Sequence, residues 1–473
     1  MSSGGGLLDL VARGKKDTFF TSNPKICHFH SVYQRHPAST QEIRITQPRN
    51  NADWGKYVDF EIEPVGDIVK KFVLLINLPS WLPPEQARQN PTSITSDLND
   101  VTYGYTQDIG TSLIDKVQVF NDQILIHEFW GTWLSWRAGH QINAPIYAQL
   151  VGRHIPTPHE IAKAATPISP IRVNLPILGD QRHDDMGFPL TAVTKQRFRI
   201  RIHLNKLEDL VESSDNQFKP SPWNKTFKQQ TSRDQPPQTF QTIQRYQMKP
   251  PTLSLETTQV YIPRDSQEYL KRTVISLPFQ MTQQCIFTVE DNKWLPALNP
   301  NSTVSIPLPL DFIGPTSRIT VGIQSEANQM SNQRYMLFAP AGAGAAAAAA
   351  TKNSHFINDI RLNMGTIDRI NKWNPTIMRD VANYYKNEKE NRDPYGNPLN
   401  IYTLTFGLKE TEQYRPLGTL NLSRSLEATL YVDLAAVSAD PRSNSRKAFI
   451  IVYSESWNIF EIRDGQGKVL FAD

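Results

Sequence analysis

Apolar and polar residues alternate along many short stretches of this chain, a pattern typical of β-strands with one buried face. The clearest example is RFRIRIHL at 197–204, in which the apolar residues at 198, 200, 202 and 204 share one face. Its arginines and His203 share the other face. The same alternation recurs at 69–78, 253–262, 401–408, 428–434 and 448–453. The chain is therefore predicted to consist mainly of strands.

The residues 116–126 predict a β-hairpin. Two strand-like stretches, 116–120 and 123–126, flank the pair Asn121-Asp122. Asn and Asp tolerate the positive φ that tight hairpin turns require. Helices are predicted to be few and short, at 7–12 and around 129–136.

Two stretches in the first half of the chain resemble two in the second half. The segment 113–130 aligns without gaps against 356–373, with apolar residues at matching positions and a turn pair, Asn121-Asp122 or Met364-Gly365, in register. Further along, FRIRIHL at 198–204 matches ATLYVDL at 428–434 in pattern and order. These two matches indicate a duplicated β domain.

The segment 213–251 differs in composition from the rest of the chain. It is rich in Gln, Ser, Thr and Pro and poor in aliphatic residues. Such composition predicts a linker between the two halves. A second unusual segment is Ala339–Ala350 (APAGAGAAAAAA). It is interpreted either as a loop of small residues or as alanines standing in for residues of undetermined identity, and no function is drawn from it.

Composition and charge exclude several classes of protein. The chain has 50 basic and 46 acidic residues, which are dispersed, so its net charge of +4 does not indicate nucleic-acid binding. The arginines at 197–201 are interpreted as a charged outer face because no stacking aromatic residues are interleaved with them. The two cysteines predict neither a disulfide framework nor a Cys-rich zinc domain, and they favour a reducing compartment. We expect a soluble protein, since no apolar run has the length of a signal peptide or membrane span.

The stretch CHFHSVYQRH at 27–36 is the strongest candidate for a metal site. In a strand, His28 and His30 point to the same side and Cys27 points to the other, which leaves the two histidines as a possible ligand pair. Cupins, a jelly-roll class of metalloenzyme, need a glutamate shortly after such a pair, where this chain has Gln34 and Arg35. The favoured interpretation is a plain strand, with His28 and His30 as the weaker alternative.

Other chemical signals are thin. The chain has no nucleophile elbow, P-loop or HExxH motif, so no catalytic residue and no cofactor is predicted. The carboxylate pairs Glu61/Glu63 and Glu388/Glu390 are interpreted as surface residues, although glycoside hydrolysis uses such pairs. A carbohydrate-binding protein, a glycosidase and a cupin-type metalloenzyme remain the alternatives. Asn301, in Asn-Ser-Thr, is the best candidate for glycosylation.

The order of several short motifs resembles the major capsid proteins of nucleocytoplasmic large DNA viruses. Each motif is weak alone, but the ordered set covers most of the chain. The motifs are Leu10-Val11-Ala12, Gly14, Asp17, Thr21, Asn23-Pro24, Ile26, Phe29, Val32-Tyr33, Arg35-His36, Gly66-Asp67-Ile68, Gly187-Phe188-Pro189-Leu190, Trp457-Asn458-Ile459, Gly465-Gln466-Gly467 and Phe471-Ala472.

This resemblance implies an all-β fold of two consecutive eight-stranded jelly rolls, with few short helices in the loops and the N-terminal arm. The predicted division is an arm at 1–23, a first jelly roll at 24–212, a linker at 213–251 and a second jelly roll at 252–473. The implied function is structural. Members of the family trimerise into pseudo-hexagonal capsomers that tile an icosahedral shell around an internal membrane and a DNA genome.

The partners implied by the resemblance are two further copies of the chain, neighbouring capsomers, minor capsid and penton proteins, and the inner viral membrane through the N-terminal arm. Sequence-specific contact with nucleic acid is not expected. The implied location is the virion, with assembly in the host cell cytoplasm. Candidate trimer contacts are the tryptophans at 81, 223, 294 and 457.

Overall fold

The structure is a computed structural model of all 473 residues. Contacts divide the chain into two units, Met1–Ser39 and Thr40–Asp473, and the fold below is that of the second unit. The structure describes the residues 38–79, 93–96, 103–106, 108–141, 150–152, 170–178, 187–213, 227–230, 238–240, 249–290, 304–326, 329, 332, 357–365, 367–381, 401–407, 417–423, 427–434 and 447–471.

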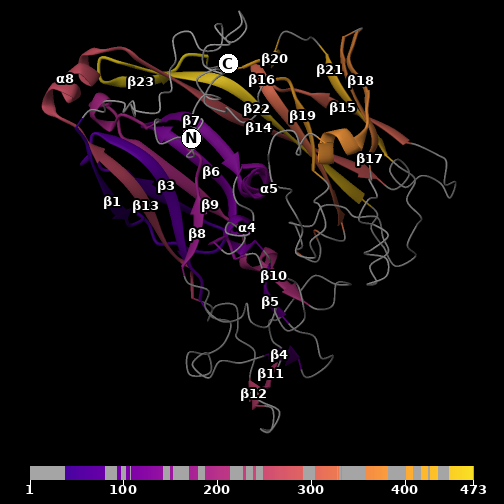
Figure 1. The fold of residues 1–473 in the computed structure, drawn as a ribbon. Coiled ribbons are helices and arrows are strands. Elements are labelled where there is room, and N and C mark those ends of the chain that lie inside the picture. Colours follow the sequence, from indigo (N-terminus) through magenta and orange to yellow (C-terminus); the bar gives the residue numbers. More distant parts are fainter. Residues whose placement is uncertain are drawn as a thin grey trace, which may run out of the picture. The chain divides into compact units, whose positions relative to one another are not determined.

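The first half of this unit forms a sandwich of two four-stranded sheets (Figure 1). One sheet has the order β1-β13-β3-β8 and the other the order β2-β9-β6-β7, with antiparallel neighbours throughout. The strands are β1 (Thr40–Thr46), β2 (Tyr57–Glu61), β3 (Ile68–Asn77), β6 (Ile114–Asn121), β7 (Ile124–Trp130), β8 (Ile171–Asn174), β9 (Phe198–Leu204) and β13 (Thr252–Tyr261).

The second half repeats this topology. Its sheets have the orders β14-β22-β16-β19 and β15-β21-β17-β18, and β20 (Leu420–Asn421) and β23 (Gln466–Val469) extend the first of them. In each half the first strand pairs with the last and the second strand pairs with the last but one, which is the jelly-roll arrangement. The predicted all-β double jelly roll is confirmed. The strands are β14 (Ile275–Glu290), β15 (Val304–Leu310), β16 (Pro315–Ser325), β17 (Ile357–Met364), β18 (Ile367–Trp373), β19 (Ile401–Thr405), β21 (Ala428–Leu434) and β22 (Lys447–Arg463).

Short elements fill the connections. Two small sheets join β4 to β11 and β12, and β5 to β10. Among the described residues the helices are few and short, as predicted, and the helix predicted at 7–12 lies outside those residues. These elements are β4 (Ser93–Ser96), β5 (Tyr103–Tyr105), β10 (Val211–Ser213), β11 (Phe227–Gln230), β12 (Gln238–Phe240), α4 (Ile109–Ser112), α5 (Gly131–Gln141), α8 (Arg264–Arg272), the 3₁₀ turns η1 (Leu190–Ala192) and η2 (Leu207–Asp209), and the π-helical turn η4 (Ile377–Val381).

The internal repeat predicted from the sequence is visible in the strand register. The hairpin β6–β7 and its repeat β17–β18 lie beside β9 and β21 in the same way, and each first strand has an irregularity after its first paired residue. The matching partners are Ile114–Leu204, Val117–Ile202, Val119–Ile200 and Asn121–Phe198 in the first half, and Ile357–Leu434, Ile360–Val432, Leu362–Leu430 and Met364–Ala428 in the second.

The two hairpins differ in detail from the gapless alignment. Trp130 pairs with Lys116, whereas Trp373 pairs with Ile360, the counterpart of Val117. The strand β18 therefore holds one extra residue near its end, where Lys372 adopts a left-handed conformation (φ 45°). The hairpin turns use Asp122 (φ 54°) and Gly365 (φ 66°), consistent with the predicted need for positive φ.

The strand pairing corrects the predicted place of β13. We expected 252–473 to form the second jelly roll, but β13 pairs with β1 and β3 and is the last strand of the first. The segment 213–251 therefore lies between two strands of the first jelly roll, β9 and β13, and not between the halves. Alternation shows that β13 is a strand, but not which sheet it joins. The connection between the two jelly rolls contains α8.

The predicted helix around 129–136 begins later than expected. Residues up to Trp130 belong to β7, and α5 starts at Gly131. A Cβ atom on Gly131 would lie 2.1 Å from the carbonyl oxygen of Ile114 and 2.3 Å from that of Thr111. Only glycine allows the chain to pass this close to the neighbouring backbone as it leaves the strand.

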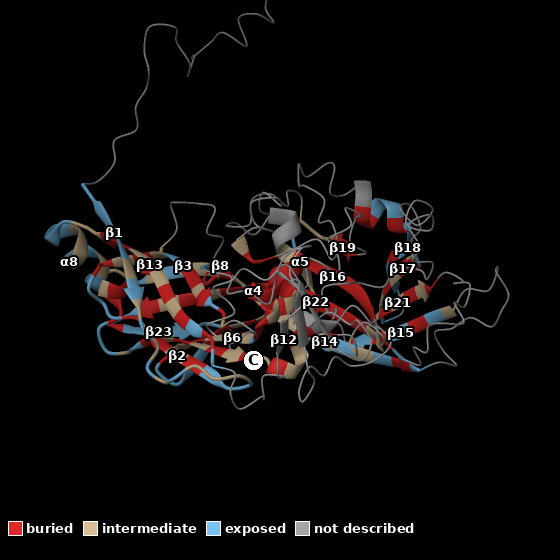
Figure 2. Ribbon diagram, turned by 90° about the horizontal axis from the view of Figure 1, so that it is seen from below, coloured by how far each residue is buried: buried red, intermediate tan, exposed pale blue. Residues whose placement is uncertain are grey.

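Each jelly roll encloses its own apolar core, and two long strands connect the cores (Figure 2). The strands β14 and β22 pair over their full lengths. In β22, Ile450 and Val452 belong to the core of the second jelly roll, whereas Phe460 and Ile462 belong to that of the first. This shared ribbon ties the two jelly rolls into one body.

Candidate functional site

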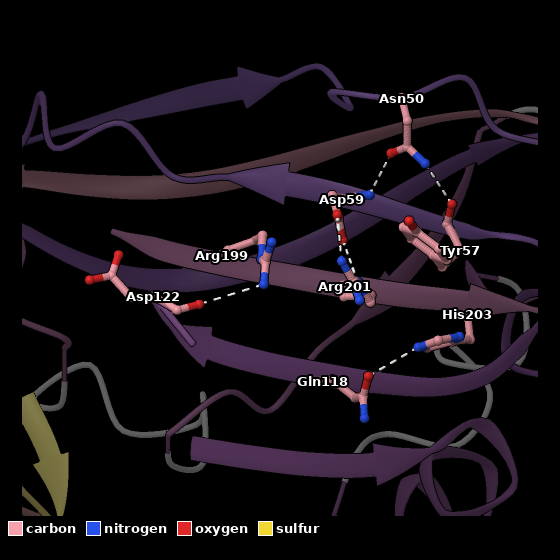
Figure 3. Close-up of polar contacts among 8 residues, drawn as sticks. All are labelled: Asn50, Tyr57, Asp59, Gln118, Asp122, Arg199, Arg201 and His203. Atoms are coloured by element: carbon pink, nitrogen blue, oxygen red, sulfur yellow. Dashed lines mark hydrogen bonds and ion pairs between the residues drawn. The ribbon is translucent and has the colours of Figure 1, made fainter. Parts of the chain in front are cut away.

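The outer face of the sheet β2-β9-β6-β7 carries the arginines that the sequence places opposite the core (Figure 3). Arg201 donates two hydrogen bonds to Asp59, of 2.8 and 2.9 Å, and its guanidinium lies 4.2 Å from the ring centroid of Tyr57. Hydrogen bonding to Asp59 raises the pKa of Arg201. Arg197 binds Glu61 at 3.2 Å.

The other polar groups on this face are also engaged. Arg199 lies 5.0 Å from the ring centroid of Phe120 and donates to the backbone oxygen of Asp122. His203 is hydrogen-bonded to Gln118 at 3.0 Å, and its partial burial lowers its pKa. The arginines are balanced by carboxylates and aromatic rings of the same chain, as expected for a charged outer face.

The contact between the two jelly rolls centres on Tyr453 of β22. Its hydroxyl is hydrogen-bonded to Thr132 of α5 and accepts a hydrogen bond of 2.9 Å from Gln284 of β14. The rings of Trp130 and Trp136 lie 6.1 and 5.1 Å from its ring. Burial raises the pKa of the Tyr453 hydroxyl, so this group stays a neutral donor.

A buried ion pair lies beside Tyr453. Glu455 of β22 accepts a hydrogen bond of 3.2 Å from the indole nitrogen of Trp133 and lies 3.8 Å from Arg318 of β16. All three side chains are buried. A buried charge is tolerated only when it is paired, so these residues fix how α5 sits on the sheet.

A buried histidine lies at the same junction. His127 of β7 packs against Phe129 and against Phe279 of β14, with ring centroids 5.0 and 6.0 Å apart. Neither ring nitrogen has a hydrogen-bond partner among the described residues. Burial and the nearby charge of Arg137 lower the pKa of His127 to about 3, which keeps the ring neutral.

A cleft of about 1190 Å³ opens between the edge strands β1 and β2 of the first jelly roll. Its floor is apolar and includes Phe188 and Phe198, whereas its rim carries charges. The rim residue Glu61 binds Arg49 and Arg197, so it is not a free catalytic acid. The cleft therefore lacks the pair of available carboxylates that a glycosidase would use at Glu61/Glu63.

Two further surfaces carry exposed apolar side chains. One is the outer face of the sheet β1-β13-β3-β8, where Ile43 and Ile45 of β1 are exposed. The other is the end of β18, where Trp373 and the nearby Ile377 of η4 are exposed, whereas Ile367 is exposed at the hairpin turn. Exposed apolar side chains that gather in one place are typical of contact surfaces.

Several predicted site residues lie outside the described residues. These are the candidate metal ligands His28 and His30, the candidate glycosylation site Asn301, the segment Ala339–Ala350 and the tryptophans at 81, 223 and 294. Trp457, the fourth candidate trimer contact, is buried within its own chain. Within the described part of the chain, no group of three His, Cys, Asp or Glu residues is placed to hold a metal ion. None of the helices described there is long and apolar enough to cross a membrane.

The junction residues Thr132, Trp133, Tyr453 and Glu455 were not singled out from the sequence. Tyr453 and Glu455 lie in a strand whose residues 448–458 are nearly all buried, so one face carries polar groups that point into a contact. The available signal was the length of β22, which at 17 residues exceeds a usual strand. A strand of this length extends beyond one sandwich into the next.

Proteins of known name match parts of this chain, although no family model matches it. It is 24% identical over 207 residues to "Probable capsid protein 4" of Acanthamoeba polyphaga mimivirus. The aligned region covers 43% of this chain and 38% of that protein. It is 26% identical over 224 residues to the "Major capsid protein" of Pyramimonas orientalis virus. The aligned region covers 45% of this chain and 49% of that protein. The chain thus spans less than half the length of these relatives.

Solved structures match over nearly the whole chain. The PBCV-1 protein VP54, fitted into a reconstruction of the virophage Sputnik, superposes with a TM-score of 0.69 at 16% identity, covering 94% of this chain and all 100% of that one. The "Faustovirus major capsid protein" superposes with a TM-score of 0.60 at 12% identity, covering 95% of this chain and 94% of that one. The resemblance to the major capsid proteins of large DNA viruses is confirmed, and these similar proteins are structural proteins of capsids rather than enzymes.

Proposed function

We propose that this chain is the major structural protein of a viral capsid and has no catalytic role. Three copies form a pseudo-hexagonal capsomer, and capsomers tile an icosahedral shell around an internal membrane and a DNA genome. The observation that carries this proposal is the duplicated jelly roll, in which both halves share one strand order and the strands β6 and β17 lie in the same register against β9 and β21. Because each chain contains two similar units, three chains place six similar units around one axis.

The site geometry supports a mechanical role. The junction at Tyr453 and Glu455 is buried and hydrogen-bonded to Thr132 and Trp133 of α5, and β14 and β22 run through both cores. The two jelly rolls therefore move together. A rigid two-unit block suits a tile, because the angle between its halves sets the geometry of the contacts that it makes.

The partners of the proposed tile are two further copies in the capsomer, neighbouring capsomers, and minor capsid and penton proteins. The arm at 1–23 is proposed to reach the inner viral membrane or neighbouring capsomers. Direct sequence-specific binding of nucleic acid is not part of the proposal, since the arginines at 197–201 are already engaged by Asp59, Glu61 and aromatic rings. The proposed location is the virion, with assembly in the host cytoplasm.

The solution mass of the purified chain tests this function. Light scattering on a sizing column is expected to give about 161 kDa, three times the chain mass of 53.8 kDa, and negative-stain images are expected to show a hexagonal outline. A particle of 53.8 kDa at micromolar concentration would contradict the capsomer. A monomer that retains stoichiometric metal would redirect attention to His28 and His30 and to the cupin alternative.

A further inference from the structure

The strand β1 (Thr40–Thr46) is an open edge of the sheet β1-β13-β3-β8. It pairs with β13 along all seven of its residues without an irregularity, and its other side meets no strand among the described residues. Figure 2 shows β1 at one end of the unit 40–473, largely in the colour of exposed residues. The backbone N–H and C=O groups along this side offer a template for one further strand.

The other outer strands of the four main sheets have features that hinder such pairing. β15 contains Pro307 and Pro309, and proline cannot donate a backbone hydrogen bond. β18 contains the left-handed Lys372 and has an irregular register. β2, β8 and β19 are five, four and five residues long, and β14 lies against β7 through Phe279 and His127. β1 is neither short nor kinked and contains no proline, so its edge lacks these protections.

The sequence of β1, TQEIRIT, is complementary to itself in the antiparallel direction. When two β1 strands pair with Ile43 at the centre, Glu42 of each copy lies opposite Arg44 of the other. The threonines at the two ends of the strand also lie opposite each other. Opposite charges that face each other across a strand pair are stabilising, and this register contains two such pairs.

The neighbouring registers of the same strand pair are unfavourable. A shift by two residues places Glu42 opposite Glu42 of the second copy, or Arg44 opposite Arg44, and like charges in this position are destabilising. A shift by one residue turns the isoleucines of the two copies to opposite faces. The order of charges in β1 therefore favours one register, with its two-fold axis at Ile43.

The outer face of the paired strands buries apolar surface in this register. Ile43 and Ile45 share that face and are 65% and 59% exposed in the single chain. Ile43 of one copy lies directly opposite Ile43 of the other, and each Ile45 lies diagonally beside the Ile43 of the other copy. Four isoleucines thus form one cluster, and such cross-strand neighbours stabilise a sheet.

The opposite face of the paired strands joins four charges. Within one chain, Nε of Arg44 lies 3.4 Å from Oε2 of Glu42, and the two side chains remain 35% and 49% exposed. Glu42 also accepts a hydrogen bond of 2.6 Å from the hydroxyl of Tyr261. A second copy gives each carboxylate a second guanidinium, so charges of opposite sign alternate across the two-fold axis. A network of this kind contributes more than an isolated exposed pair.

We propose that two copies of this chain join edge to edge through β1, in an antiparallel pair centred on Ile43. The two four-stranded sheets β1-β13-β3-β8 then form one continuous sheet. A two-fold contact uses the same surface on both copies, and a three-fold capsomer cannot contain it. The inference therefore rests on the proposed function and assigns this contact to neighbouring capsomers.

Reversal of single charges tests the pairing by light scattering. Wild type is expected to rise from about 161 kDa towards about 323 kDa, three and six times 53.8 kDa, in a concentration series up to about 100 µM. E42R and R44E each place like charges opposite each other and are expected to stay at about 161 kDa. R463E is the matched control, because Arg463 is also exposed but ends β22 in a different sheet. This control is expected to associate as wild type does.

The two single variants together separate the proposal from simple misfolding. In a mixture of E42R and R44E, every charge of one chain again meets an opposite charge of the other. The mixture is expected to associate, and so is the double variant E42R/R44E, in which the two charges are exchanged. Association of E42R alone or R44E alone to the extent of wild type would contradict the register.

A disulfide locates the two-fold axis. In a C27S/C285S background, I43C places two cysteines directly opposite each other, within the Cα separation that a disulfide bridges. Mild oxidation is expected to give linked chains of about 107.6 kDa, twice 53.8 kDa, on a non-reducing gel. I45C is the matched control, since its cysteine lies opposite Gln41 and not opposite a second cysteine. Equal linkage of the two variants would overturn the register.

The outcomes distinguish this contact from the function on which it rests. If wild type stays a trimer at every concentration and I43C forms no linked chains, the β1 pairing is wrong while the capsomer stands. If wild type is not a trimer but I43C links selectively, the β1 pairing stands and the capsomer fails. A mixture of E42R and R44E that does not associate, beside a wild type that does, would show that these charges do not face each other.

Discussion

The outer face of β14-β22-β16-β19 is covered by the first jelly roll, whereas the outer face of the equivalent sheet β1-β13-β3-β8 is open. The two sheets have the same strand order, but their outer side chains differ. The covered face is polar: Tyr453 and Glu455 are hydrogen-bonded across the junction to Thr132 and Trp133, and Arg318 pairs with Glu455 within the sheet. The open face carries Ile43 and Ile45.

This difference indicates two ways to specify a contact. A buried polar group without a partner is costly, so the hydrogen bonds at Tyr453 and Glu455 allow one placement of α5 and disfavour others. The open face relies on apolar area, which attracts without fixing direction. A permanent junction within a chain suits the first kind, and a contact that forms during assembly suits the second.

The largest effect is expected from breaking the covered face at Tyr453. Y453A removes a buried ring and leaves Thr132 and Gln284 without their shared partner, so we expect a loss of roughly 3–5 kcal/mol in the free energy of unfolding. Y453F retains the ring and is expected to cost about 1–2 kcal/mol. Urea unfolding measures both, and equal losses in the two variants would contradict the role of packing at this position.

The next effect compares ion pairs on the two faces. E455Q removes a buried charge that faces Arg318, and we expect a loss of about 3 kcal/mol in the free energy of unfolding. E256Q breaks the Glu256–Arg172 pair on the open face, which is partly exposed, and is expected to cost about 1 kcal/mol or less. Urea unfolding measures both changes. Equal losses in the free energy of unfolding would mean that the covered face excludes water no better than the open face.

A smaller effect is expected from pH at the junction. The folded pKa of His127 is about 3 and its ordinary value is 6.5, so below pH 6.5 the unfolded chain binds a proton that the folded chain does not. Stability is therefore complete above pH 6.5 and falls by about 1.4 kcal/mol per pH unit towards pH 3.

Unfolding of wild type and H127L between pH 7 and 5 measures this slope. We expect the His127 contribution, about 2 kcal/mol at pH 5, to be absent in H127L. The difference between the two chains isolates His127, because the other titrating groups are common to both. Parallel pH profiles would show that this ring is protonated or solvated in the folded state.

The smallest effect is expected away from both faces. R201K on the outer face of β9 retains the charge but loses the two-pronged contact with Asp59, and we expect a loss of about 0.5–1 kcal/mol in the free energy of unfolding. Thermal unfolding measures this change, and light scattering is expected to find its trimer intact. Loss of the trimer in R201K would add this face to the contacts between copies.

Local patterns predicted much of the fold. The alternation at 198–204 gave the correct inward face, and the match between 113–130 and 356–373 anticipated the register of both hairpins against β9 and β21. These features depend on side-chain period alone, which a sequence displays directly. The extra residue in β18 was invisible because Lys372 gives no signal of a left-handed conformation.

The partners of strands and surfaces could not be read in the same way. The place of β13 depends on a pairing with β1, more than 200 residues earlier by number, and composition made 213–251 resemble a linker. The junction brings Trp133 to Glu455 across 322 residues. Contacts of this range follow from the closed topology, and residue spacing within one segment carries no information about them.

A map of the isolated oligomer by electron cryo-microscopy, at a resolution that shows side chains, tests the central claim most directly. The account predicts three chains around one axis, with their six jelly rolls giving a pseudo-hexagonal outline. An oligomer of another copy number, or one without six similar units around its axis, would contradict the account.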